Sequence, residues 1–284
     1  MKITEFADIL LFHIFSFLDL KELVKSSEVC HLFYSVSKNI ILTNQTKNIM
    51  RPDLFFNSLY RLNLDNYEYI SSAWKNLLFY VVLDSKKNQN ILEKKCPENV
   101  IFSLAGLDLI EMDKIDPSVK YLDCPMKIIA SKNSISDSLI YLNMTEQLYI
   151  PENLNFSGKS LRYLDLSFSD VLNVNLNFSK NLKKVNMMGV SNLVSLKGFG
   201  FVEELNIDYC ELLDDLTPLK NIKFLSMKYN KVIKKVPPLK TLDEINISHS
   251  AVEDLTQLPN LTKVYFKNIE NLKLNLKNYN FMEL

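Results

Sequence analysis

The stretch Leu161-Arg162-Tyr163-Leu164-Asp165-Leu166 has apolar residues at its first, fourth and sixth positions. The same spacing recurs downstream in five further triplets: Leu182/Val185/Met187, Val202/Leu205/Ile207, Ile222/Leu225/Met227, Leu242/Ile245/Ile247 and Leu261/Val264/Phe266. These units begin at positions 161, 182, 202, 222, 242 and 261, so their spacing is nearly constant. Self-similarity at a fixed period indicates a repeat architecture in which each unit is stable only when stacked on its neighbours.

The repeat extends toward the N-terminus. Triplets at Leu139/Leu142/Met144 and Val119/Leu122/Cys124 keep the same period. Leu59/Leu62/Leu64 also fits, whereas the units that begin at Leu78 and Val100 are the weakest in the series. At the other end, Phe281 lies one period after Leu261, so a further unit is expected to begin there.

Each unit has room for a short strand but little room for a full helix after it. Prolines in the return stretches also disfavour a helix; these are Pro218, Pro237, Pro238 and Pro259. We therefore expect a parallel sheet on one side and loops or short 3₁₀ turns on the other.

Small residues that can form hydrogen bonds stand at the ninth position of several units: Ser169, Cys210, Asn230 and Ser250. Two residues later come Val171, Leu212, Val232 and Val252, and the return stretches carry Leu216/Leu219, Val236/Leu239 and Leu255/Leu258. With these features the chain resembles the leucine-rich-repeat family in a short form of about 20 residues per unit. The resemblance implies a solenoid with a parallel concave sheet, in which the ninth side chain bonds to backbone groups of the turn.

Residues 5–40 are predicted to form three short helices. Leu10, Leu11, Ile14, Phe15 and Leu18 recur at spacings of three and four, which places them on one helical stripe. So few residues cannot bury so many large apolar side chains among themselves. The stripe must therefore contact either the rest of this chain or a partner, and the pattern leaves both alternatives open.

The N-terminal segment resembles an F-box. The aligned stretches are 6–18, then Asp19-Leu20-Lys21-Glu22-Leu23, then Val29-Cys30-His31-Leu32-Phe33, with Ala7, Ile9 and Phe33 in place of the family's Pro, Glu and Trp. The resemblance implies docking on a Skp-type adaptor through some of Phe6, Leu10, Leu11, Ile14, Phe15, Leu18, Val29 and Phe33. Others of this set must hold the three helices together.

The expected fold class is α+β multidomain. Residues 1–45 are assigned to the F-box, 46–58 to a connector or solenoid cap, and 59–284 to the leucine-rich-repeat solenoid.

Side chains between the inward apolar residues are expected to point to the concave face. Tyr121, Tyr141 and Tyr163 occupy the third position of successive units and are expected to stack. The predicted target-binding residues are Tyr121, Tyr141, Tyr163, Phe168, Tyr209, Phe224, Tyr229 and His249. Aromatic side chains of this kind suit a protein or peptide partner, but strand tyrosines also simply favour sheet formation.

The composition gives little support to an enzyme, a metal protein or a nucleic-acid binder. The 33 basic residues balance the 33 acidic ones, the 4 cysteines lack metal-ligand spacing, and the 5 glycines and 3 histidines are few. Gly158-Lys159-Ser160 lacks the glycine of a phosphate loop, because residue 153 is Asn153. We predict no catalytic residue, no metal, no cofactor and no nucleic-acid partner.

The apolar run 9–18 follows two acidic residues and is too short for a membrane span, so no membrane association is predicted. The few cysteines favour a cytoplasmic or nuclear protein. The two family resemblances together imply a substrate-recognition subunit of an SCF-type cullin–RING ubiquitin ligase, bound to an unknown protein target. Two alternatives stay open: a structural component of an adaptor-containing complex, and a plain leucine-rich-repeat interaction scaffold.

Overall fold

The computed structural model describes only part of the chain. The described residues are 59–62, 78–83, 92–93, 95–96, 100–104, 115–124, 135–147, 150, 156, 158–171, 178–269, 272–273 and 280–283. The predicted F-box helices and the segment 46–58 lie outside these residues. The domain boundaries therefore stay predictions.

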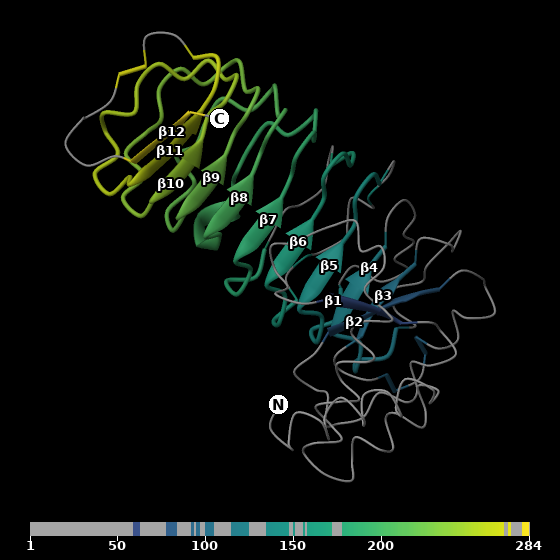
Figure 1. Cartoon of the computed structure of the whole chain (residues 1–284). Coiled ribbons are helices and arrows are strands. Elements are labelled where there is room, and N and C mark those ends of the chain that lie inside the picture. Colours follow the sequence, from purple (N-terminus) through teal and green to yellow (C-terminus); the bar gives the residue numbers. More distant parts are fainter. Residues whose placement is uncertain are drawn as a thin grey trace, which may run out of the picture.

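The described residues form a single solenoid sheet of twelve parallel strands, and the strands follow one another in chain order (Figure 1). The strands are β1 (Leu59–Leu62), β2 (Leu78–Val82), β3 (Val100–Ser103), β4 (Tyr121–Asp123), β5 (Tyr141–Asn143), β6 (Tyr163–Asp165), β7 (Lys184–Asn186), β8 (Glu204–Asn206), β9 (Phe224–Ser226), β10 (Glu244–Asn246), β11 (Lys263–Phe266) and β12 (Asn280–Glu283). The parallel solenoid expected from the repeat is confirmed.

The described part of the chain contains one short helix, the 3₁₀ helix η4 (Phe199–Phe201) in a return stretch. This element agrees with the expectation of loops or 3₁₀ turns opposite the sheet. The α+β class is not supported by the described residues, because it depends on the N-terminal helices that lie outside them.

Equivalent positions of neighbouring units face each other throughout the well-defined repeats. Tyr141 pairs with Tyr163, Leu164 with Val185, and so on through β10 and β11. The fourth-position side chains therefore form one continuous buried row: Leu122, Leu142, Leu164, Val185, Leu205, Leu225, Ile245 and Val264. Each fully buried side chain of this size stabilises the fold by about 1.5–3 kcal/mol.

Two of the expected registers are wrong, those of the units that contain β3 and β12. Ile101 pairs with the third-position Tyr121, so the unit of β3 begins at residue 99 rather than at Val100. Phe281 pairs with Val264 and therefore takes the fourth position of its unit, not the first. In the unit of β3, the buried side chains Phe102 and Leu104 occupy the fourth and sixth positions. Val100 is also buried, which is why the sequence pattern suggested it as the first position.

The expectation for the residue two after the turn is also wrong in two units. Leu212 and Val232 are 58% and 47% exposed, and the following residues Leu213 and Ile233 are buried instead. These units take one more residue to return to the core than the unit that begins at 242, where Val252 is buried at the expected position.

Phenylalanine rings fill the core behind the sheet. The Phe156 and Phe178 ring centroids lie 6.1 Å apart, and the Phe178 and Phe199 rings meet edge to face at 4.7 Å. Edge-to-face pairs are favourable because the positive edge of one ring meets the negative face of the other. Phe199 stands at the start of η4 and is fully buried, so the 3₁₀ turn serves to place this ring.

Replacing Phe199 with Ala is expected to lower the free energy of unfolding by about 3–5 kcal/mol, because it leaves a cavity beside Phe178. The measurement is urea denaturation followed by circular dichroism. The matched control is Phe201→Ala in the same 3₁₀ turn, where the ring is 41% exposed. Equal destabilisation by the two variants would contradict the assignment of Phe199 to the core.

Candidate interaction surface

The third position of each unit lies on the open face of the sheet. The rings of Tyr141 and Tyr163 stack with centroids 4.6 Å apart and planes inclined by 8°, which confirms the predicted stacking for this pair. Tyr163 and Tyr121 are half-buried, but only 4% of Tyr141 is exposed. Tyr141 therefore mainly covers its neighbours, and its predicted role in target binding stays untested.

Charged residues on the same face are paired between neighbouring units. Lys184 Nζ lies 2.8 Å from Glu204, and Lys263 Nζ lies 2.5 Å from Glu244. At the second position Glu203 lies between Lys183 and Lys223, at 2.5 and 2.8 Å.

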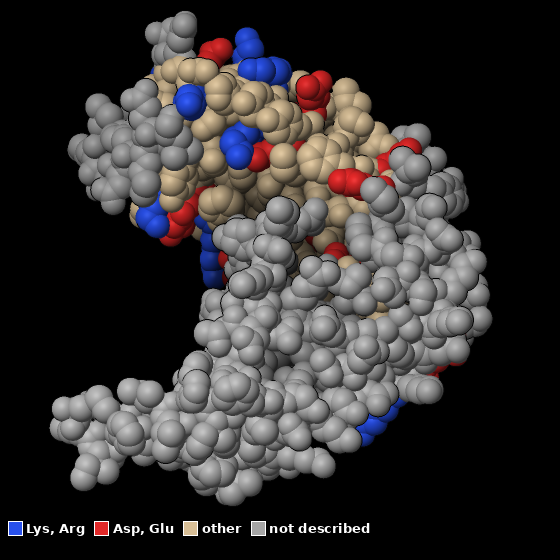
Figure 2. Space-filling view, turned by 45° about the vertical axis from the view of Figure 1, so that its right-hand side comes forward, with Lys and Arg blue, Asp and Glu red and all other residues tan. Residues whose placement is uncertain are grey.

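Hydrogen bonds from the ammonium group of Lys183, and to a smaller extent from that of Lys223, hold the pKa of the Glu203 carboxyl below its usual value. Figure 2 shows the resulting mixture of basic and acidic side chains over the described surface. Because the charges alternate along the array, they form no continuous basic patch in the units from 182 to 263.

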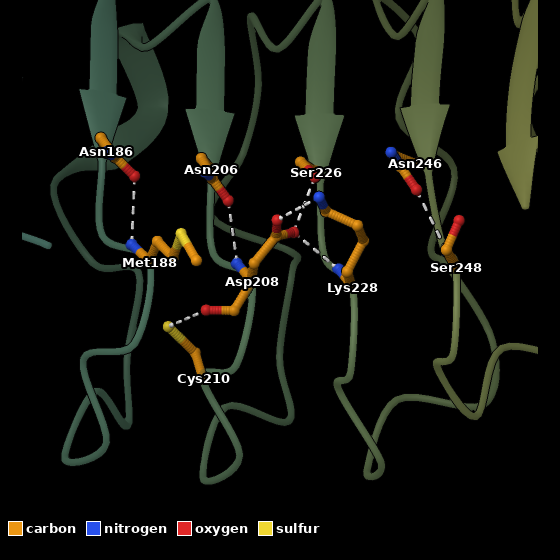
Figure 3. Close-up of polar contacts among 9 residues, drawn as sticks. All are labelled: Asn186, Met188, Asn206, Asp208, Cys210, Ser226, Lys228, Asn246 and Ser248. Atoms are coloured by element: carbon orange, nitrogen blue, oxygen red, sulfur yellow. Dashed lines mark hydrogen bonds and ion pairs between the residues drawn. The ribbon is translucent and has the colours of Figure 1, made fainter. Parts of the chain in front are cut away.

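Polar side chains at the fifth position hold the backbone where each strand ends (Figure 3). In each case the side-chain oxygen accepts a hydrogen bond from the backbone N–H two residues later. The pairs are Asn143–Thr145 at 3.1 Å, Asp165–Ser167 at 2.9 Å, Asn186–Met188 at 3.2 Å, Asn206–Asp208 at 3.0 Å and Asn246–Ser248 at 3.1 Å. These side chains are thus committed to the fold, because each one satisfies a backbone donor.

Ser226 interrupts this series, and Asp208 of the preceding unit takes over its task (Figure 3). The Asp208 carboxylate accepts hydrogen bonds from Lys228 N–H at 2.7 Å and from Ser226 Oγ at 2.6 Å. It also pairs with Lys228 Nζ at 3.1 Å, although Asp208 itself is almost fully buried. A buried carboxylate is tolerated here because it has both hydrogen bonds and a counter-charge.

Ninth-position side chains bond to the turns, as the sequence predicted. Asn230 Nδ2 donates to the carbonyl oxygens of Cys210 and Leu213, both at 3.0 Å, and its Oδ1 accepts from Val232 and Ile233 N–H. Ser169 Oγ donates to Met144 O at 2.8 Å, and Ser250 Oγ accepts from Val252 N–H at 3.3 Å. Cys210 Sγ bonds to Met187 O at 3.1 Å.

The eighth position has a backbone conformation that the sequence did not reveal. Among the described residues, those at this position all have positive φ: Glu146 (58°), Phe168 (56°), Gly189 (70°), Tyr209 (61°), Tyr229 (62°), His249 (59°) and Asn268 (53°). This left-handed conformation costs roughly 1–2 kcal/mol for an L-residue. It is held because the backbone N–H of each unit donates to the next, for example Tyr209 to Lys228 O at 2.9 Å and His249 to Lys267 O at 2.7 Å.

Three eighth-position rings form a continuous stack at the edge of the sheet where the strands end. Tyr209 and Tyr229 lie 4.3 Å apart with planes inclined by 12°, and Tyr229 and His249 lie 4.7 Å apart with planes inclined by 5°. Asn268 Nδ2 lies 3.1 Å from His249 Nδ1 and caps the far end. We call Tyr209, Tyr229 and His249 the edge stack.

Several of the predicted binding residues meet in one groove of about 400 Å³ over β5–β9. Its lining includes Tyr141, Tyr163, Phe168 and Phe224, together with the Lys184–Glu204 pair. The edge stack does not line this groove but follows Phe168 along the same edge. The predicted residues other than Tyr121, which lines neither surface, therefore divide into a groove set and an edge set.

The described cysteines, Cys96, Cys124 and Cys210, are reduced thiols and are buried. Burial raises the pKa of Cys210 to about 12, and burial together with the Asp116 carboxylate raises that of Cys96 to about 11. Burial, with a smaller effect of Asp123, also raises the pKa of Cys124. A neutral buried thiol is a poor nucleophile, so these cysteines serve packing.

Within the described residues, no group of three or more His, Cys, Asp and Glu side chains could hold a metal ion. No helix in the described part of the chain has the length and apolar character that a membrane span requires.

In a comparison with known protein families, residues 8–44 match the F-box-like family model. These residues lie outside the described part and coincide with the segment whose sequence resembles an F-box. No curated protein matches the chain.

Three solved structures are similar to this chain. The TLR13 chain of a TLR13–ssRNA13 complex is 17% identical over 79% of this chain and 36% of its own length, with a TM-score of 0.48. The functional domain of InlJ from Listeria monocytogenes is 14% identical over 69% of this chain and 48% of its own, with a TM-score of 0.40. The internalin InlF from Listeria monocytogenes is 13% identical over 74% of each chain, with a TM-score of 0.40. The chain thus spans about a third and about half of the first two proteins.

Replacing Asp208 with Ala is expected to lower the free energy of unfolding by about 2–3 kcal/mol, because it leaves the Lys228 N–H and the Ser226 hydroxyl without their acceptor. Adding Ser226→Asn to this variant is expected to recover about 1 kcal/mol of the lost free energy of unfolding. In the neighbouring units, Asn206 and Asn246 at the fifth position each accept the N–H two residues later, and Asn at position 226 would accept the Lys228 N–H in the same way. Urea denaturation of the wild type, both single variants and the double variant checks the cycle. If the effects of the two single variants on the free energy of unfolding simply add in the double variant, Asn at position 226 does not replace Asp208 as the acceptor of the Lys228 N–H.

Cys96, Cys124 and Cys210 are expected to resist iodoacetamide in the folded chain near neutral pH and to react after unfolding in urea, as read by mass spectrometry. The raised thiol pKa values also predict that the free energy of unfolding does not depend on thiol ionisation at pH values below 9.0, the ordinary thiol pKa. Above it, stability falls as the pH approaches the folded-state values, because the unfolded thiols ionise first. Rapid alkylation of all three thiols in the native chain would contradict their burial.

Proposed function

We propose that this chain, which joins an F-box-like segment to a leucine-rich-repeat solenoid, is the substrate-recognition subunit of an SCF-type cullin–RING ubiquitin ligase. The F-box-like residues 8–44 bind a Skp-type adaptor, and the repeats bind the protein to be modified. The observation that carries this proposal is the combination of the two modules in one chain.

Both modules are of kinds that typically mediate protein interactions and perform no chemistry. In this role the chain contributes proximity: it raises the effective concentration of a target lysine near the ubiquitin-conjugating enzyme. No cofactor or metal takes part, and the chain works in the cytoplasm, the nucleus or both, where its partners are found.

The solenoid surface supports a protein target. Its groove presents the half-buried aromatic side chains Tyr163 and Phe224 beside the Lys184–Glu204 ion pair. Partly exposed aromatic residues among satisfied polar groups are typical anchors of protein interfaces. The paired charges of this face give no support to a polyanionic partner or a membrane surface.

The F-box assignment predicts that Leu11→Asp combined with Ile14→Asp lowers capture of a co-expressed Skp-type adaptor at least tenfold, because charges enter the apolar stripe. Affinity capture of the full-length chain measures this. The control is Tyr209→Ala, which lies on the solenoid and is expected to leave adaptor capture unchanged. Unaltered adaptor capture by the double variant would refute the F-box role.

A second measurement separates a ligase subunit from a structural component. The ligase role requires that the adaptor-bound chain also captures a cullin, and that a bound target turns over in a cullin-dependent manner. Capture of the adaptor without a cullin would favour a structural component, and capture of neither would favour a plain interaction scaffold.

A further inference from the structure

The edge stack ends abruptly at Tyr209. Tyr229 covers one face of the Tyr209 ring at 4.3 Å. On the opposite side the preceding unit carries Gly189 at the same position, so no ring of that unit continues the stack. Within the described part of the chain, Tyr209 has no ring contact on this side, and 39% of its surface is exposed.

Gly189 is not required there by its backbone. Its φ of 70° resembles the values of 56–62° that Phe168, Tyr209, Tyr229 and His249 adopt in the other units. With the Phe168 ring in its present position, a Cβ at Gly189 would lie 2.4 Å from it, so a side chain there would require this ring to move. Phe168 thus leans over Gly189, and the glycine permits this position of the ring.

A hollow lies between Phe168 and Tyr209. Its lining includes both rings, Gly189, Met188 and Leu212, with Glu211 beside them. Phe168 and Leu212 are 54% and 58% exposed, so the apolar walls face solvent. Because Tyr229 fixes the Tyr209 ring from behind, the free face of Tyr209 is already oriented for a planar group, which reduces the entropy cost of binding.

The charge around this hollow is acidic. Glu211 lines it. Glu146, at the eighth position of the unit before Phe168, lines the groove over β5–β9, which shares Phe168 and Met188 with this hollow. Both carboxylates are exposed, and neither has an ion-pair partner among the described residues, unlike Glu203, Glu204 and Glu244 of the sheet face. Two basic side chains stand in the neighbouring turn: Lys228 is paired with Asp208, and Lys231 Nζ donates to the carbonyl oxygen of His249.

We propose that this hollow binds an aromatic side chain of the target protein that is flanked by Lys or Arg. The incoming ring stacks on the free face of Tyr209 and contacts Phe168 and Leu212, which extends the edge stack by one member. The flanking cations meet Glu211 and Glu146, and a cation is further favoured near the tyrosine face. The same carboxylates disfavour a nucleobase, because its phosphates would approach two unpaired negative charges. This inference rests on the proposed function, in that the solenoid holds the target.

The test uses the full-length chain and three fluorescein-labelled peptides of equal length, identical except for a central Lys-Trp-Lys, Lys-Ala-Lys or Glu-Trp-Glu. Fluorescence anisotropy is expected to show about tenfold tighter binding of the Lys-Trp-Lys peptide than of the other two. Tyr209→Ala is expected to remove this preference and Tyr209→Phe to keep it. Glu211→Lys is expected to weaken binding of the Lys-Trp-Lys peptide, whereas Asp214→Lys in the same loop serves as the matched control and leaves it unchanged.

Three results would overturn the inference: no binding of the Lys-Trp-Lys peptide, equal binding of all three peptides, or equal effects of Glu211→Lys and Asp214→Lys. Tighter binding of a labelled oligo-dT that depends on Tyr209 would assign the hollow to single-stranded nucleic acid instead. A concentration-dependent dimer lost in Tyr209→Ala would assign it to a second copy of the chain. Adaptor capture is measured on the same samples, so failure of the peptide test with intact adaptor capture refutes only this site, and the reverse refutes only the F-box role.

Discussion

The structure depends on one constraint: parallel strands in register place each side chain directly against its equivalent in the next unit. An apolar residue is therefore buried only if the neighbouring unit supplies another, as Leu164, Val185 and Leu205 do for one another. The same constraint governs the surface. Like charges side by side would repel, and the observed rows instead alternate in sign, as in Lys184–Glu204 and Glu244–Lys263. Aromatic residues in one row must stack, and this is how the edge stack arises.

The sequence was most informative where this constraint acts on apolar side chains. The period of the triplets predicted the parallel sheet, the order of the strands and the buried fourth-position row, because only a stacked array buries these residues. The ninth-position side chains were also predictable, since Ser169, Cys210 and Asn230 are all able to bond to a turn and do so.

Prediction failed where two residues were equally suited to one place or where the backbone decided the outcome. Leu212 and Leu213 are adjacent and equally apolar, and the length of the turn determines which one is buried. The positive φ at the eighth position was not predictable from Phe168, Tyr209 or Tyr229, because aromatic residues rarely adopt it. Their conformation is imposed by backbone hydrogen bonds between units. Gly189 and Asn268 were signals of this kind, because Gly and Asn adopt positive φ more readily than most residues. Gly189 also leaves room for the Phe168 ring.

The eighth position thereby separates two surfaces that the sequence had combined. Groove residues such as Tyr163 and Phe224 stand on strands and share their surroundings with ion pairs. The edge stack stands on turns whose backbone N–H groups donate to carbonyl oxygens of the next unit. Its rings are therefore positioned by backbone hydrogen bonds between units, as are the rings on the strands. A partner that contacts both surfaces meets an almost rigid template, and the ordering of side chains adds little to the cost of binding.

The acceptor that Asp208 provides for Lys228 has a consequence for how such an array changes during evolution. Most units, for example those that begin at 182 and 242, carry their own strand-end acceptor, Asn186 or Asn246. Recombination can duplicate or delete units of this kind without leaving a backbone donor unsatisfied. The units that begin at 202 and 222 are instead expected to be inherited as a pair, because a unit inserted between them would separate the Lys228 N–H from the Asp208 carboxylate.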